Sequence, residues 1–277
     1  MNIKSTINGV CFENSMGIDL GLTFDCGQCF RWAKKDNYYI GTAYGKTVEI
    51  SAKDGLIYIE GTNETDFRNI WAKYLDLNTN YQKITQEISN LSPEINQAVK
   101  LYSGIHILSQ EPWETLCSFI ISQNNNIPRI KKIIESLCEN FGQKISNSYA
   151  FPSAKTLSRL SVEDLSVIKS GFRAKYIFDA AQKVVSDEIN LEKISKMPLD
   201  EARKALMTIN GVGPKVAECV LLYGMHRLEA FPLDVWMKRV MQTLFCGKSP
   251  EIFGAYAGVA QQYLYHYSRM NPEKFKD

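Results

Sequence analysis

A lysine and an aspartate nineteen residues apart are the residues of this chain best suited to chemistry together. Lys215 is expected in the first turn of a helix, where the positive end of the helix dipole and any burial both disfavour its ammonium form. A lysine present as the free amine can act as a nucleophile. Asp234 precedes an amphipathic stretch from Val235 to Leu244 and is therefore predicted to be the N-cap of another helix.

The segment Asn210-Gly211-Val212-Gly213-Pro214 predicts a tight turn between two helices, because two glycines permit positive φ and proline suits the first position of a helix. The backbone amides of such a hairpin point outward at a helix N-terminus. Gly211 and Gly213 are therefore expected to bind one phosphate of a nucleic acid backbone. Taken singly, the glycines also fit a plain turn and the aspartate a plain cap. Their conjunction with Lys215 within 35 residues favours a functional site.

This conjunction resembles the helix-hairpin-helix Gly-Pro-Asp superfamily of DNA glycosylases. Its adenine glycosylase and endonuclease III branch has four clustered cysteines for an iron-sulfur cluster near the C-terminus, whereas only Cys219 and Cys246 follow the hairpin here. Its alkylbase branch keeps the aspartate but generally lacks the hairpin lysine, so Lys215 argues against that branch. Neither a metal nor another cofactor is expected.

Within the superfamily, the chain resembles the 8-oxoguanine DNA glycosylase/AP lyase family from about Gly17 to its C-terminus. Besides the hairpin and Asp234, four separated stretches carry the resemblance, and their order along the chain is that of the family. They are residues 27–32 (GQCFRW), 118–129 (SFIISQNNNIPR), 171–176 (GFRAKY) and 257–261 (AGVAQ).

The resemblance implies that this chain excises 8-oxoguanine from duplex DNA and then cleaves the strand. Lys215 would attack the sugar C1′ and form a Schiff base that permits β-elimination, and Asp234 would stabilise positive charge on the sugar. The carbonyl of Gly27 would accept the N7 hydrogen of the lesion, and Gln261 would read its Watson-Crick edge. Cys219 and Tyr265 would sandwich the ring, with tyrosine standing where the family usually has phenylalanine.

The resemblance also implies contacts with the rest of the duplex. Asn124 would fill the space left by the extruded base, and Phe172 would wedge between bases. Arg129 and Arg173 would read the orphaned cytosine, although either arginine could instead contact phosphate. The asparagines at 124–126 would also fit an ordinary solvated loop.

Two positions depart from the family pattern. Trp236 stands where many members have histidine, two residues after the catalytic aspartate, and Ser268 stands where an acidic residue is expected. Those two family residues pair with each other, so their joint replacement puts in doubt the phosphate contact expected at position 236 and a strict preference for cytosine opposite the lesion.

Composition restricts the class of protein. With 277 residues and 45% hydrophobic content, the chain can form one or two cores, and a net charge of only +2 requires that any DNA contact use localised charge and backbone amides. Seven scattered cysteines favour reduced thiols in a cytosol. The first residues lack the apolar core of a signal peptide and no apolar run approaches the length of a membrane span, so an intracellular protein without a membrane partner, and a monomer, is expected.

The hydrophobic pattern changes from short β-prone runs to helical periodicity at Glu64. This predicts an α+β fold, with a small antiparallel sheet domain with flanking helices (residues 1–95) packed on a mostly helical domain (96–277) that holds a helix-hairpin-helix motif at about 199–225. The expected strands are 18–24, 28–33, 37–42, 46–51 and 56–61. The expected helices are 64–76, 80–90, 94–102, 112–123, 127–141, 162–169, 173–186, 199–208, 214–225, 234–245 and 252–268.

Two rival functions also fit the sequence. A non-catalytic helix-hairpin-helix DNA-binding protein would need the hairpin but neither Lys215 nor Asp234. A glycosylase for alkylated or other oxidised purines would keep the chemistry and change the base pocket, where Gly27 and Gln261 favour 8-oxoguanine.

Overall fold

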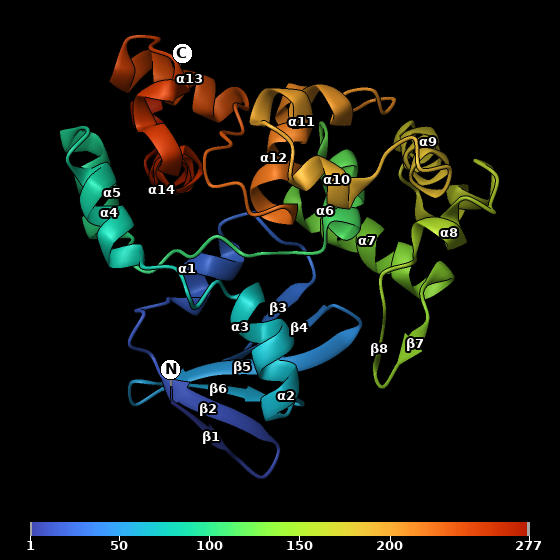
Figure 1. The fold of residues 1–277 in the computed structure, drawn as a ribbon, viewed down its shortest axis with the longest axis horizontal. Helices are drawn as coiled ribbons and strands as arrows, with labels where there is room; N and C mark the ends of the chain where they lie inside the picture. Colours follow the sequence, from blue (N-terminus) through green and yellow to red (C-terminus); the bar gives the residue numbers. More distant parts are fainter. Residues whose placement is uncertain (1, 276–277) are drawn as a thin grey trace.

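An antiparallel sheet forms the N-terminal part of the protein and helices form most of the rest, which confirms the α+β prediction (Figure 1). The computed structural model describes residues 2–275. Tyr44-Gly45 and Asp54-Gly55 turn two of the hairpins with positive φ at all four residues, the geometry of type I′ turns. In spatial order the strands are β1 (Ile3–Ser5), β2 (Gly9–Glu13), β6 (Leu56–Glu60), β5 (Lys46–Lys53), β4 (Tyr38–Ala43) and β3 (Trp32–Lys35).

Most predicted helices are present with ends shifted by a few residues. The first of them contains a π turn, η1 (Phe67–Trp71), between α2 (Glu64–Asp66) and α3 (Ala72–Tyr74). Those that follow are α4 (Tyr81–Ser89), α5 (Pro93–Leu101), α6 (Pro112–Ser122), α7 (Ile127–Phe141), α9 (Arg173–Val185), α11 (Leu199–Leu206), α12 (Pro214–Cys219) with the π turn η3 (Val220–Gly224), α13 (Val235–Phe245) and α14 (Ala257–Met270).

The strand predicted at 18–24 is wrong, because these residues mostly form helix α1 (Leu20–Asp25). Alternating apolar residues suggested a strand, but Asp19 caps a helix by accepting a hydrogen bond from Leu22 N. The helix buries Leu20, Thr23 and Phe24, which have the spacing of one helical face. The strand predicted at 28–33 is also wrong for most of its length, since only its last two residues belong to β3.

Sequence patterns missed β1, β2 and several short elements. Residues 9–12 in β2 are all buried, so this strand lacks the alternation that marks one exposed face. The segment predicted as a helix at 162–169 contains the 3₁₀ helix η2 (Asp164–Ile168), and 252–268 begins as another, η4 (Pro250–Tyr256). The other missed elements are α8 (Ala154–Leu157), α10 (Leu191–Ser195), η5 (Pro272–Phe275) and the hairpin of β7 (Lys144–Ile145) with β8 (Ser148–Tyr149).

Two hydrophobic clusters hold the molecule together. One lies between the sheet and α2–α3, where Trp32 Nε1 donates to Tyr74 Oη at 2.6 Å and Trp71 packs edge-on to Trp32. The other fills the helical part and also takes in Cys26 and Phe30 from the N-terminal part of the chain. The loop at 26–30 therefore crosses into the helical core. The division of the chain at 95/96 stays a prediction.

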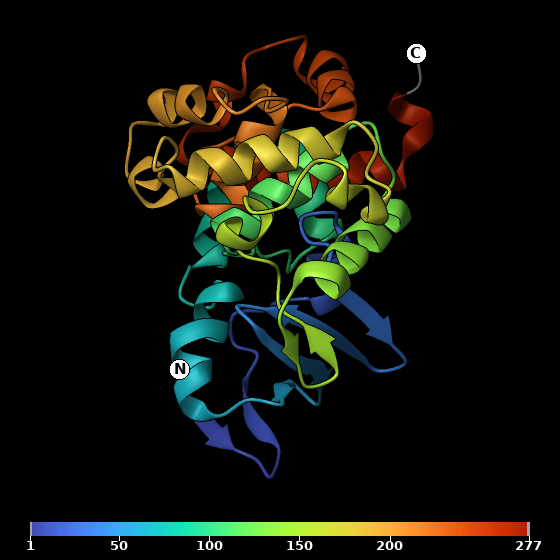
Figure 2. The same cartoon turned by 90° about the vertical axis from the view of Figure 1, so that its right-hand side faces the viewer.

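Charged and polar contacts bind the two parts together. Arg31 forms an ion pair with Glu114 at 3.3 Å and donates to the carbonyl of Tyr149, so the 27–32 stretch is tied to α6 and β8. Burial raises the pKa of Glu114 to about 7 despite Arg31. Figure 2 shows the β7–β8 hairpin lying beside the sheet, and Ser148 Oγ lies 3.0 Å from Thr42 Oγ1.

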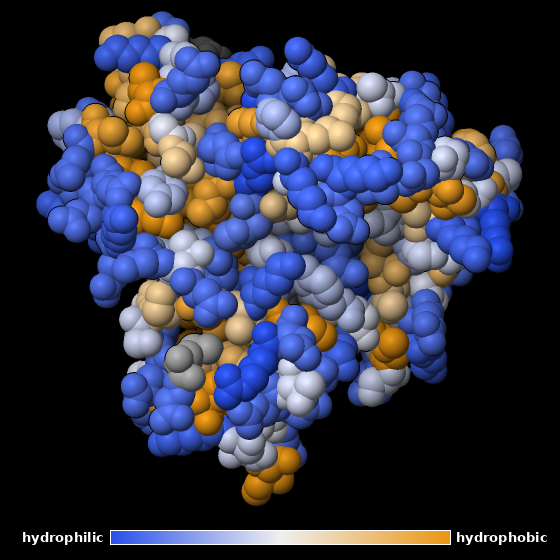
Figure 3. All heavy atoms as spheres, viewed as in Figure 1, coloured by the Kyte–Doolittle hydropathy of each residue, from blue (hydrophilic) through white to orange (hydrophobic). Residues whose placement is uncertain are grey.

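The face of the molecule seen in Figure 3 is mainly hydrophilic, with hydrophobic residues in smaller groups. Among the helices of residues 2–275, none has the length and apolar character needed to cross a membrane.

Candidate active site at the helix-hairpin-helix

The predicted hairpin joins α11 to α12 and is held rigidly from behind. Gly211 has φ of +79° and packs against the ring of Tyr176 on α9. The backbone N and the Nδ2 of Asn210 donate hydrogen bonds to the carboxylate of Asp179, which also lies on α9, at 2.8 and 2.7 Å. Gly213 is the N-cap of α12, and a side chain there would meet open space. The hairpin backbone is thus fixed, with open space at the start of α12.

Replacing Gly211 with alanine is expected to destabilise the protein by about 1–3 kcal/mol, because the new Cβ would overlap the Tyr176 ring at a positive φ. A thermal melt measures this loss. Gly213→Ala is the matched control, because its φ is −95° and its Cβ would be unobstructed, so its melting temperature should fall less. Equal losses in the two variants would contradict the account of Gly211.

Lys215 lies in the first turn of α12, half-buried, with Nζ 5.0 Å from the centroid of the Phe119 ring. Its side chain lies close to the thiol of Cys219, one turn further along the helix, and both residues line the same pocket. Burial raises the pKa of Cys219 to about 11, although the nearby Lys215 acts against this. The thiol is therefore neutral near pH 7, and Nζ of Lys215 lies close both to this sulfur and to the Phe119 ring.

Asp234 is the N-cap of α13, as predicted, and its Oδ1 accepts from Met237 N at 2.8 Å. The turn that leads to Asp234 is held by Glu218, a residue that was not predicted from the sequence. The buried Glu218 accepts a hydrogen bond from Phe231 N at 2.7 Å through Oε2 and pairs with Arg203 on α11 through Oε1. A carboxylate three residues after Lys215, on an otherwise apolar helix, was the available signal. Glu218 thereby links α11 and α12 to the turn that carries Asp234.

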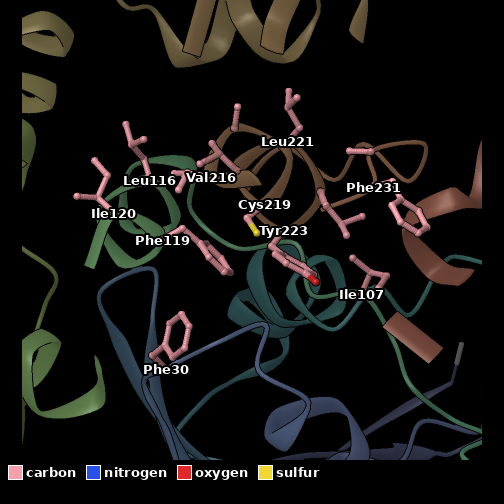
Figure 4. Packing of buried hydrophobic residues seen from close by; sticks show 14 of the residues in the cluster. Phe30, Ile107, Leu116, Phe119, Ile120, Val216, Cys219, Leu221, Tyr223 and Phe231 are labelled. Atoms are coloured by element: carbon pink, nitrogen blue, oxygen red, sulfur yellow. The ribbon is translucent and has the colours of Figure 1, made fainter. Parts of the chain in front are cut away.

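Lys215 and Asp234 line both a small inner pocket and a wider outer cleft. The inner pocket has a volume of about 50 Å³ and the cleft about 480 Å³. The inner volume holds only a few water molecules, so a purine ring enters only if side chains move. Figure 4 shows Cys219, Tyr223 and Phe119 close together in the packed core around it. The inner pocket is lined by Cys26, Gly27, Phe119, Lys215, Cys219, Tyr223, Pro232, Asp234, Gln261 and Tyr265.

The four predicted base-binding residues, Gly27, Cys219, Gln261 and Tyr265, therefore converge on one pocket with the two predicted catalytic residues. Gly27 has φ of +87° at the crossing loop, a conformation that favours glycine. The hydroxyl of Tyr265 accepts a hydrogen bond from Arg269 Nη1 at 3.3 Å, which supplies the partner that phenylalanine would not need.

The two departures from the family pattern lie in different surroundings. Trp236 lines the outer cleft, with the Arg239 guanidinium carbon 5.7 Å from the centroid of its ring. Ser268 is completely buried and donates to the carbonyl of Tyr265 at 2.9 Å. The side chain of Ser268 is therefore buried and bonds within α14, while Trp236 lines the outer cleft.

The residues predicted to contact the opposite strand gather around the loop before α7, outside the inner pocket. Asn124 is exposed with φ of +46°, Arg129 is exposed on α7, and Phe172 is half-exposed beneath the guanidinium of Arg173. Arg173 differs from expectation: it is 4% exposed and donates to the carbonyls of Gln123, Asn124 and Ser170. In this structure it clamps the asparagine loop instead of facing solvent as a base-reading side chain would.

The other two asparagines of the loop have structural roles. Asn126 caps α7 by accepting from Arg129 N at 3.0 Å, and Asn125 Nδ2 donates to the carbonyl of Ile121 at 3.1 Å. Asn124 is exposed and takes neither of these two roles.

The glycine hairpin, Lys215 and the capping carboxylate of Asp234 define a class of protein. The similarity of the chain to known proteins agrees with that class. Residues 117–252 match the family model of the HhH-GPD superfamily base excision DNA repair protein, so the chain is a helix-hairpin-helix base excision repair protein. Residues 11–116 match the N-terminal domain of 8-oxoguanine DNA glycosylase. The chain belongs to the 8-oxoguanine DNA glycosylase family.

Three relatives show how far the similarity extends. An N-glycosylase/DNA lyase of Saccharomyces cerevisiae is 34% identical over 82% of this chain and 68% of its own length. The Clostridium acetobutylicum 8-oxoguanine glycosylase/lyase, solved with duplex DNA containing cytosine opposite 8-oxoguanine, is 38% identical with a TM-score of 0.94 over 98% of this chain and 99% of its own. MBOgg1, solved with a low-affinity DNA ligand, is 43% identical with the same TM-score and the same coverage.

Proposed function

We propose that this protein excises 8-oxoguanine from duplex DNA and cleaves the strand at the resulting abasic site. The observation that carries the proposal is the convergence of Lys215 and Asp234 with Gly27, Cys219, Gln261 and Tyr265 on one pocket. Family membership supports the glycosylase and AP-lyase class of activity, and the solved relative with cytosine opposite the lesion supports the choice of substrate.

The chemistry begins with extrusion of the damaged base, because the base is inaccessible within the duplex. The Lys215 amine attacks C1′, the C1′–N9 bond breaks, and the base leaves with that electron pair and takes up a proton. The C1′–O4′ bond then breaks, O4′ leaves with the electron pair and takes up a proton, and C1′ forms the Schiff base with the lysine nitrogen. Removal of a C2′ proton then expels the 3′ phosphate by β-elimination. Asp234 stabilises the positive charge that develops on the sugar.

Base selection uses the rest of the pocket. The Gly27 carbonyl accepts the N7–H of 8-oxoguanine and repels the N7 lone pair of guanine. Gln261 binds the Watson-Crick edge, with Cys219 and Tyr265 on the two faces of the ring. Since the pocket is smaller than a purine as it stands, Tyr265 and Arg269 at its mouth must shift when the base enters.

The remaining predicted contacts hold the duplex. The amides at Gly211 and Gly213 bind a phosphate of the lesion strand, and Trp236 packs against that strand in the outer cleft. Asn124 fills the gap left by the extruded base, Phe172 wedges beside it, and Arg129 reads the opposite cytosine. Arg173 holds the loop that carries Asn124, and it reaches the base only if its hydrogen bonds to that loop break. We further propose that the enzyme acts inside the cell as a monomer.

Borohydride trapping tests the proposal directly. The protein is incubated with an 8-oxoguanine:cytosine duplex and borohydride, beside undamaged and alkylated-base duplexes. A covalent adduct confined to the 8-oxoguanine duplex is expected. An adduct on the alkylated duplex instead would indicate the rival glycosylase, and binding with no adduct on any duplex would indicate the non-catalytic reading.

A further inference from the structure

The loop that carries Gly27 is held by buried hydrogen bonds at both of its neighbours. A Cβ at Gly27 would lie 3.7 Å from Tyr265 Cε1, so the side of Gly27 on which a side chain would stand faces the pocket. The residue itself has no side chain with which to fix its carbonyl. The direction of the Gly27 carbonyl therefore depends on the groups that hold Cys26 and Gln28.

The side that follows Gly27 is held by Gln28, which is completely buried. Its Nε2 donates to the carbonyls of Thr23 at 2.9 Å and His106 at 2.8 Å, and its Oε1 accepts from Leu108 N at 2.9 Å. Gln28 belongs to the family-like GQCFRW stretch, and these bonds explain a glutamine there. This anchor joins the loop to the segment before α6.

The side that precedes Gly27 is held by Gln262 and Tyr223, neither of which the family resemblance assigns a role. Gln262 Nε2 donates to the Cys26 carbonyl at 3.1 Å, and Tyr223 Oη donates to Gln262 Oε1 at 2.6 Å. Gln262 is 1% exposed and Tyr223 4%. Tyr223 stacks on Phe119 with ring centroids 5.4 Å apart, and Figure 4 shows its hydroxyl pointing away from that ring. The chain of bonds links η3, α14 and the crossing loop.

We propose that Tyr223 and Gln262 are positioning residues that set the aim of the Gly27 carbonyl and thereby the selectivity for 8-oxoguanine over guanine. The inference rests on the proposed role of Gly27 in base reading. 8-Oxoguanine carries a hydrogen at N7 and guanine does not. A displaced Gly27 carbonyl therefore loses both its attraction for 8-oxoguanine and its repulsion of guanine. The Tyr223 hydroxyl also lies 3.5 Å from Gln261 Oε1, and so stands behind the second base-reading group.

The test uses Tyr223→Phe, which removes the hydroxyl alone, and Gln262→Met, which keeps the length of the side chain without its amide. In a Lys215→Gln background, the ratio of the dissociation constants for guanine:cytosine and 8-oxoguanine:cytosine duplexes should fall roughly tenfold, the factor that one hydrogen bond is worth. With Lys215 intact, single-turnover excision of 8-oxoguanine should fall by a similar factor. Cleavage of a preformed abasic duplex, which presents no base to read, should be unchanged.

Tyr263→Phe is the matched control, because Tyr263 is the next residue on α14, is 1% exposed, and has its hydroxyl near the backbone of Gly104 and Ile105 and not at Cys26 or Gln262. It should leave the selectivity ratio unchanged. A selective wild type whose ratio survives both test substitutions overturns the positioning role alone. Parallel loss of abasic cleavage also overturns it, since that would mark a packing role. A wild type that does not prefer 8-oxoguanine overturns the proposed function and the inference with it.

Discussion

Lys215→Gln is expected to abolish covalent trapping and to lower the single-turnover rate of base excision by at least about 10⁴-fold, because the variant lacks the amine that attacks C1′. Lesion binding should remain largely intact, since the base contacts come from other residues of the pocket. Because Lys215 is only half-buried and glutamine is an acceptable helix residue, the fold should tolerate the change. Borohydride trapping, single-turnover excision and a binding titration measure these effects.

Lys83→Gln is the matched control, since Lys83 is an exposed lysine that pairs with Glu87 on α4, well removed from the cleft residues in the sequence. It should trap and excise like the wild type. Retained excision by Lys215→Gln without trapping would mean that water displaces the base directly, and retained trapping would assign the nucleophile to another amine.

The sequence was most informative where one local pattern has one structural solution. Two glycines before a proline fix a hairpin, and an aspartate before an amphipathic stretch fixes a cap; both lie where predicted. The convergence of Gly27 and Gln261 with Lys215 came from family resemblance, because no local pattern places residues so far apart in one pocket.

Local patterns failed where burial or long-range pairing decides the structure. Residues 18–24 alternate like a strand but fold as a capped helix, and β2 is buried on both faces and shows no alternation. The bond from Gln262 to Cys26 spans 236 residues, and Glu218 reaches Phe231 13 residues away. Nothing in sequence spacing reveals such partners. Arg173 shows the same limit, because two of the three carbonyls that accept hydrogen bonds from its guanidinium, those of Gln123 and Asn124, lie 50 and 49 residues earlier.

Asp234→Asn is expected to slow single-turnover excision about 10²–10³-fold while leaving the melting temperature nearly unchanged. Asparagine is as good an N-cap as aspartate, so it can still accept the bond from Met237 N that now measures 2.8 Å. What it loses is the negative charge that stabilises the cationic sugar in a partly enclosed pocket. Because the substitution preserves the cap, it separates the electrostatic role of this residue from its structural role.

The N-cap of α1 provides the matched control, since Asp19 Oδ1 accepts from Leu22 N at the same 2.8 Å but lies outside the catalytic pocket. Asp19→Asn should leave both excision and melting temperature near their wild-type values. If Asp234→Asn excises at the wild-type rate, Asp234 is a helix cap and the developing charge is stabilised elsewhere. If it loses stability as well as rate, the carboxylate supports the fold beyond its cap, and the rate cannot be assigned to electrostatics. A slow but stable variant places the negative charge of Asp234 in the chemistry of the sugar.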